Sequence, residues 1–94
     1  MPESFVAEIR LLGTDAGGRV GPLLSGEWRT VLGINNEYWS ARMLFQGTPA
    51  PGDVFQAEVQ LLMPEAQQYF PAGVEFSVWE SGTKGVGRVL SAAV

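Results

Sequence analysis

The carboxylates are the side chains of this chain best suited to acid–base chemistry or to holding a cation. Asp15, Asp53, Glu75 and Glu80 are the candidates. Catalysis needs a pair of groups whose surroundings push their pKa values apart, and no tight acidic motif of that kind occurs here. Asp53 directly follows a Pro-Gly pair, so we expect its carboxylate to accept a hydrogen bond within a turn.

The chain contains no His and no Cys. These are the most common general base, metal ligands and activated thiol of proteins, and their absence excludes ordinary zinc, haem, iron–sulfur and cysteine-protease chemistry. We therefore expect no catalytic residues, no cofactor and no bound metal, and we expect the protein not to be an enzyme. Glu80 is expected to pair with Lys84 or Arg88 instead of taking part in a reaction.

The charge balance argues against polyanionic partners. Six Lys and Arg stand against ten Asp and Glu, which gives a net charge of −4, and the cations are scattered along the chain. Binding of nucleic acid depends on neutralising phosphates, so it is not expected for this chain on its own. No apolar run approaches the length of a membrane span, and Glu3 stands where a secretory signal needs basic residues. These features favour a cytoplasmic protein that does not enter a membrane.

The composition favours a single all-β domain over residues 1–94. Apolar residues make up 46% of the chain, and 12 Gly and 6 Pro suit short strands and tight turns better than a helical bundle. Alternation of apolar and polar residues predicts strands at Phe5–Leu12, Trp28–Ile34, Tyr38–Phe45, Asp53–Met63, Val74–Trp79 and Lys84–Ala92, with a weaker signal around Leu23. The spacing indicates six short antiparallel strands closed into a small barrel, because closure removes exposed sheet edges.

The alternation also predicts which side chains face the core. Aromatic residues assigned to the inside are Trp39, Phe45, Phe55 and Phe76, together with the aliphatic residues between them and with Met63. The aromatic residues assigned to outer faces or loops are Trp28, Tyr38, Tyr69 and Trp79. Large exposed aromatics are enriched at protein contacts, so two or more of these side chains lying together would mark an interface. The opposite assignment, shifted by one residue, would exchange core and surface along a strand.

Turn chemistry separates the strands. We expect a hairpin at Asn35-Asn36, a turn of type II at Pro51-Gly52, irregular or edge backbone around Pro22, a loop over residues 64–73, and a bulge or close packing at Gly85 and Gly87.

Several short motifs occur in an order typical of one protein family. They are Phe5-x-Ala7-Glu8-Ile9, Gly17-Gly18-Arg19-x-x-Pro22, Ala41-Arg42-Met43, Pro51-Gly52-Asp53, Gly73-Val74-x-Phe76-x-Val78-x-Glu80-x-Gly82 and Gly85-x-Gly87-x-Val89. On these residues, nearly the whole chain resembles the C-terminal, third domain of bacterial elongation factor Tu. The resemblance implies a six-stranded antiparallel barrel, in agreement with the strand pattern.

The resemblance also implies partners. In the full factor a nucleotide-binding domain precedes two barrels, and the third barrel packs on that domain and helps to hold the T-stem of aminoacyl-tRNA. This chain has no Gly-x-x-x-x-Gly-Lys-Ser/Thr motif, so it cannot cradle a nucleotide phosphate as a GTPase does. Its nearest imitation, residues 82–87, lacks the spacing and precedes a strand, as expected of a turn.

Two sources give the candidate partner-binding residues. The resemblance places Gly17, Gly18 and Arg19 near the seam with the nucleotide-binding domain, whereas the alternative is an ordinary loop whose Arg19 is solvated or paired with Asp15. The resemblance also points to Lys84 as a remaining cation of the last hairpin. The pattern of outer aromatics adds Trp28, Tyr38 and Trp79.

Three functions follow as hypotheses. The first is a free-standing barrel that binds a protein, either a component of the translation apparatus or a second copy of itself. The second is an accessory protein of translation elongation that binds tRNA. The third is an enzyme with an unrecognised carboxylate site.

Overall fold

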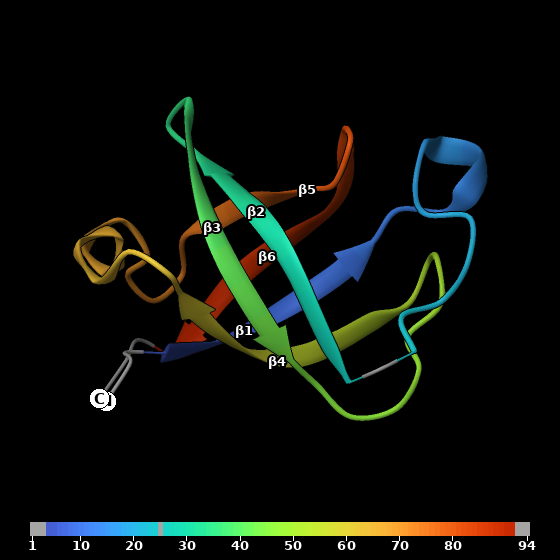
Figure 1. The fold of residues 1–94 in the computed structure, drawn as a ribbon, viewed down its shortest axis with the longest axis horizontal. Helices are drawn as coiled ribbons and strands as arrows, with labels where there is room; N and C mark the ends of the chain where they lie inside the picture. The colour runs from blue at the N-terminus through green and yellow to red at the C-terminus, as the bar shows by residue number, and fades with distance from the viewer. Residues whose placement is uncertain (1–3, 25, 92–94) are drawn as a thin grey trace.

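Six strands form a closed antiparallel barrel in the computed structural model, which describes residues 4–24 and 26–91 (Figure 1). The strands are β1 (Ser4–Leu11), β2 (Glu27–Ile34), β3 (Glu37–Leu44), β4 (Val54–Leu61), β5 (Glu75–Trp79) and β6 (Thr83–Ser91). Their order around the barrel is β1-β4-β3-β2-β5-β6, and β6 pairs with β1 to close it. The predicted all-β barrel is confirmed. Two of the sequence predictions involve Glu3 and Ala92, which lie outside the described residues.

The core fills the inside of the barrel because inward positions recur at every second residue. In β1, Phe5, Ala7, Ile9 and Leu11 are all buried, and the inward residues of β4 follow the same rule. Phe5 stacks on Phe70 with ring centroids 5.2 Å apart, and both rings meet Phe76 edge to face. Trp39, Phe45 and Phe55 pack against this core while remaining partly exposed.

Two predicted orientations are wrong. Trp28 is buried instead of outward, because the inward residues of β2 are the even-numbered ones from Trp28 to Ile34. Met63 is exposed instead of inward, because β4 ends at Leu61 and the chain then turns away from the sheet. Tyr69, predicted outside or in a loop, is half-buried and stacks on Trp39 with ring centroids 5.6 Å apart.

Two predictions about the connections also need correction. The stretch around Leu23 is not a strand, although Leu23 is buried and its N–H donates to Pro49 O at 2.8 Å. The predicted loop after β4 begins with a 3₁₀ helix, η2 (Pro64–Tyr69), because Pro64 has the fixed φ that suits a first helical turn. A second 3₁₀ helix, η1 (Thr14–Ala16), follows β1. Neither helix of the described part is long and apolar enough to cross a bilayer.

The turns follow the predicted chemistry. Asn35 and Asn36 have φ values of 52° and 64°, as the type I′ hairpin between β2 and β3 requires. Gly52 has a φ of 93°, and Asp53 Oδ2 accepts a hydrogen bond from Ala50 N at 2.9 Å, which confirms the predicted turn. Gly85 permits the predicted close packing, since a Cβ there would lie 2.7 Å from Arg10 O of the neighbouring strand.

Candidate functional site

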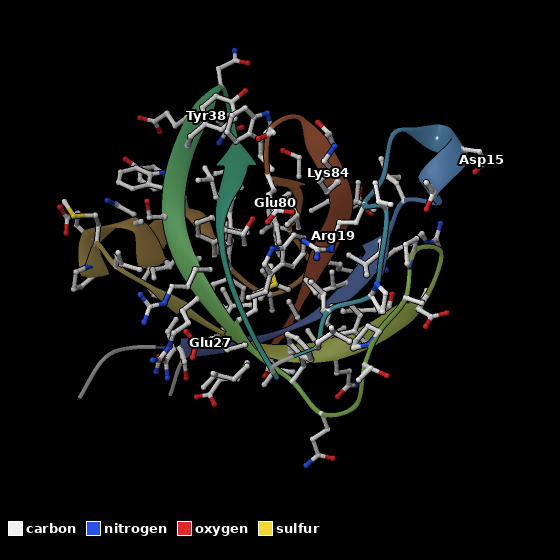
Figure 2. All side chains as sticks on the ribbon, turned by 45° about the vertical axis from the view of Figure 1, so that its right-hand side comes forward. Asp15, Arg19, Glu27, Tyr38, Glu80 and Lys84 are labelled. Atoms are coloured by element: carbon white, nitrogen blue, oxygen red, sulfur yellow. The ribbon has the colours of Figure 1, made fainter. Side chains whose placement is uncertain are left out.

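The predicted binding residues form two groups, which adjoin where Trp79 is followed by Glu80. One group, which we call the loop cluster, surrounds the connection between β1 and β2 and consists of Gly17, Gly18, Arg19, Trp28 and Lys84, joined by Glu80. The other group is the aromatic pair, Tyr38 and Trp79, on the outside of the barrel. Figure 2 shows Tyr38 near the tip of the β2–β3 hairpin, apart from Arg19 and Glu80.

Glu80 holds the loop cluster together. One of its carboxylate oxygens lies 2.6 Å from Arg19 Nη1, and the other accepts a hydrogen bond from Trp28 Nε1 at 3.2 Å. The guanidinium of Arg19 also lies over the Trp28 ring, 5.6 Å from its centroid, which is a cation–π arrangement. The predicted pairing of Glu80 with Lys84 or Arg88, and of Arg19 with Asp15, is therefore wrong. Arg19 and Glu80 are 61 residues apart in sequence, so local spacing could not reveal their contact.

Hydrogen bonds from side chains also hold the rest of the loop in place. Lys84 Nζ donates to Gly17 O at 3.1 Å, and Thr14 Oγ1 donates to Arg19 O at 2.7 Å. Gly17 has a φ of 88°, and a side chain at Gly18 would run into the backbone of Leu12. These contacts stabilise the loop. They give the two glycines, Arg19 and Lys84 a structural role in it. Their role in binding a partner stays a prediction.

The aromatic pair has the opposite character, because it projects into solvent. Tyr38 is 64% exposed and Trp79 is 41% exposed. Their ring centroids are 6.4 Å apart, with an angle of 59° between the ring planes. The prediction that both side chains face outward is confirmed. No described residue accepts a hydrogen bond from the Trp79 indole N–H.

The sheet register explains why Tyr38 and Trp79 are in contact although they are 41 positions apart in sequence. Tyr38 of β3 is opposite Gly33 of β2, and Gly33 is opposite Ser77 of β5. Trp79 lies on the same face of β5 as Ser77 and is opposite Val31. Gly33 has no side chain, and Ser77 Oγ and the Tyr38 ring fill the space over it: a Cβ at Gly33 would lie 2.5 Å from Ser77 Oγ and 3.2 Å from the Tyr38 ring. Neither Gly33 nor Ser77 was singled out from the sequence, since only the register reveals their position beside Tyr38.

A groove of about 670 Å³ adjoins Tyr38. The hairpin from Gly33 to Tyr38 forms one wall, and the outer faces of β5, β6 and β1 form the floor. Across the floor, Arg88 of β6 is opposite Glu75 on one side and Glu8 on the other. The second floor row is Ser77, Val86 and Arg10. The groove is thus aromatic at one end and charged along its floor.

No protein-family model matches this chain. The resemblance to the third domain of elongation factor Tu stays a prediction, because small barrels of this kind serve many unrelated functions.

Proposed function

We propose that this chain is a non-catalytic protein-binding module, and that the aromatic pair with its adjoining groove is the binding surface. The observation that carries the proposal is the contact between Tyr38 and Trp79, two largely exposed rings held 6.4 Å apart on the outside of the barrel. Tyr and Trp are the residue types most enriched among those that dominate binding energy at protein interfaces.

The scaffold supports this role. Both rings project from strands, so their positions are fixed by the ladders β2–β3 and β2–β5 before a partner arrives. A surface that is ordered in advance loses little conformational entropy on binding. We also propose a cytoplasmic location and, following the sequence resemblance, a component of the translation apparatus as the partner.

A capture experiment with a surface variant tests the proposal. The tagged protein is cross-linked in an extract of the source cell, and captured proteins are quantified by mass spectrometry. The double variant Tyr38→Ser/Trp79→Ser should lose the partner, because truncating each central aromatic residue costs about 2 kcal/mol or more of binding free energy.

The matched control is Leu62→Ser, which removes a side chain that is 64% exposed just after β4 and does not line the groove. This variant should retain the partner, and circular dichroism should show the same strand content for all three proteins. Equal capture by the wild type and the double variant would contradict the proposal. A second copy of the chain as the captured partner would appear in sedimentation as an oligomer that the double variant dissociates.

A further inference from the structure

The aromatic pair and the groove beside it offer hydrogen-bond donors to a segment that lies against them. The indole N–H of Trp79 and the side-chain amides of Asn35 and Asn36 make no hydrogen bond with a described residue. The guanidiniums of Arg10 and Arg88 line the same groove and form no ion pair within the described part of the chain. A segment that matches this surface must present unpaired acceptors along its length.

The groove also carries an excess of one negative charge. Glu8, Glu37 and Glu75 line it against Arg10 and Arg88. Arg88 is opposite Glu8 and Glu75 in the sheet register, whereas Glu37 stands beside Tyr38 on the hairpin. The complementary segment therefore carries a basic side chain near the aromatic end.

The fold disfavours two of the common ways of binding a peptide. Addition of a β-strand needs a free sheet edge, but the barrel is closed, and β2 and β5 separate only beyond the Gly33–Ser77 pair. An amphipathic helix needs a continuous apolar groove, but the floor here is crossed by Glu8, Arg88 and Glu75.

A polyproline II segment meets the remaining requirements. Its carbonyl groups are unpaired acceptors, proline supplies no N–H, and its pyrrolidine rings dock on exposed aromatic faces. The exposed faces of Tyr38 and Trp79, whose ring centroids are 6.4 Å apart, give such a ring a surface to dock on. We propose that the groove binds a proline-rich segment of the partner, in polyproline II conformation, with a basic residue beside Glu37. This inference rests on the proposed function and specifies its partner.

The test is a titration of the whole protein with an array of proline-rich decapeptides, each carrying one arginine, followed by calorimetry and tryptophan fluorescence. At least one peptide should bind, and replacing its prolines by alanine should weaken binding about tenfold or more. The double variant Tyr38→Ser/Trp79→Ser should have the same effect. Leu62→Ser should bind as the wild type does. Glu37→Gln should weaken the arginine-containing peptide and leave its arginine-to-alanine counterpart unchanged.

The outcomes separate this inference from the proposed function. If the peptides bind no better than their alanine counterparts, or bind the double variant equally well, the inference is overturned. If the same double variant nevertheless loses a captured protein, the proposed function stands without it. Binding of a uridine decanucleotide in place of the peptides, abolished by Tyr38→Ser/Trp79→Ser, would also overturn the inference.

Discussion

Glu80 is the residue on which the attachment of the β1–β2 loop depends. It accepts hydrogen bonds from Arg19 Nη1 and Trp28 Nε1, and its removal would take the acceptor from both groups, while Arg19 Nε would still donate to Gly21 O. We expect a double-mutant cycle with Arg19→Ala and Glu80→Ala to give a coupling free energy of about 0.5–1.5 kcal/mol, measured by urea unfolding. This coupling free energy is larger than that of a fully solvated ion pair. It is smaller than that of a buried pair, because both side chains are partly exposed.

The matched control is Arg29→Ala. Arg29 donates to Glu27 Oε2 at 2.9 Å, but its side chain is 81% exposed, so its removal should cost about 0.5 kcal/mol or less. A coupling near zero between Arg19 and Glu80 would mean that the loop is held by its apolar contacts, such as buried Leu23, instead of by the ion pair.

At the level of single residues, the sequence predicts what alternation and local spacing determine. Tyr38 and Trp79 could be assigned to the outside, and Asp53 to its turn, from neighbours within a few positions. The partner of Glu80 could not be predicted in this way, because Arg19 lies in the β1–β2 loop, 61 residues away in sequence. The predicted orientation of Trp28 is wrong for a related reason. Trp28 is the second residue of β2, so no inward residue of the strand precedes it to show which face of the alternation is buried.

At the level of elements, the β2–β3 hairpin positions the aromatic pair, and its turn depends on two residues with positive φ. Asn36 has a φ of 64°, a conformation that Asn and Gly tolerate and that Ala does not. We expect Asn36→Ala to lower the free energy of unfolding by about 1 kcal/mol. Asn36→Gly should leave it unchanged or raise it slightly, as measured by thermal unfolding. Equal losses for both variants would show that the Asn36 side chain, and not its backbone, stabilises the hairpin.

The β1–β2 loop provides a second test of an element, because two of its glycines differ sharply in their surroundings. A Cβ at Gly18 would collide with the backbone of Leu12, whereas a Cβ at Gly21 would meet nothing within 4 Å. We expect Gly18→Ala to lower the free energy of unfolding by about 1–3 kcal/mol, since the backbone it would strike cannot rotate away. Gly21→Ala should change it by less than about 0.5 kcal/mol. Similar values for the two variants in urea unfolding would contradict the observed path of the loop.

Strands were more predictable than connections for a physical reason. An alternation of period two, which is the signature of a half-buried strand, is clear in the segments Phe5–Leu12, Tyr38–Phe45, Asp53–Met63 and Val74–Trp79, and each of them forms a strand. Leu23 shows the weakness of the same signal in a short segment, because a single buried leucine next to proline anchors a loop without joining a ladder. The groove could not be predicted at all, since it arises where β2 and β5 separate after the Gly33–Ser77 pair.

At the level of the whole molecule, the distribution of charge favours the protein-binding hypothesis over the tRNA-binding one, and both stay predictions. The net charge is −4. Of the six cations, Arg19 and Arg29 pair with carboxylates, Lys84 donates to Gly17 O, and Arg42 donates to Gln60 Oε1. Arg10 and Arg88 remain, and they lie in a groove with three carboxylates. Few cations are therefore available to replace the counterions of a nucleic acid.

We accordingly expect no binding of aminoacyl-tRNA at about 0.15 M salt, because each phosphate contact adds a salt-dependent contribution that this surface lacks. Fluorescence anisotropy of labelled tRNA over a series of salt concentrations measures this directly. A plot of the logarithm of the binding constant against the logarithm of salt concentration with a slope steeper than about −2 would require several phosphate contacts, and would favour the tRNA-binding hypothesis. Repeating the series with Tyr38→Ser/Trp79→Ser identifies the face involved, since binding through scattered cations would not respond to the loss of two uncharged rings.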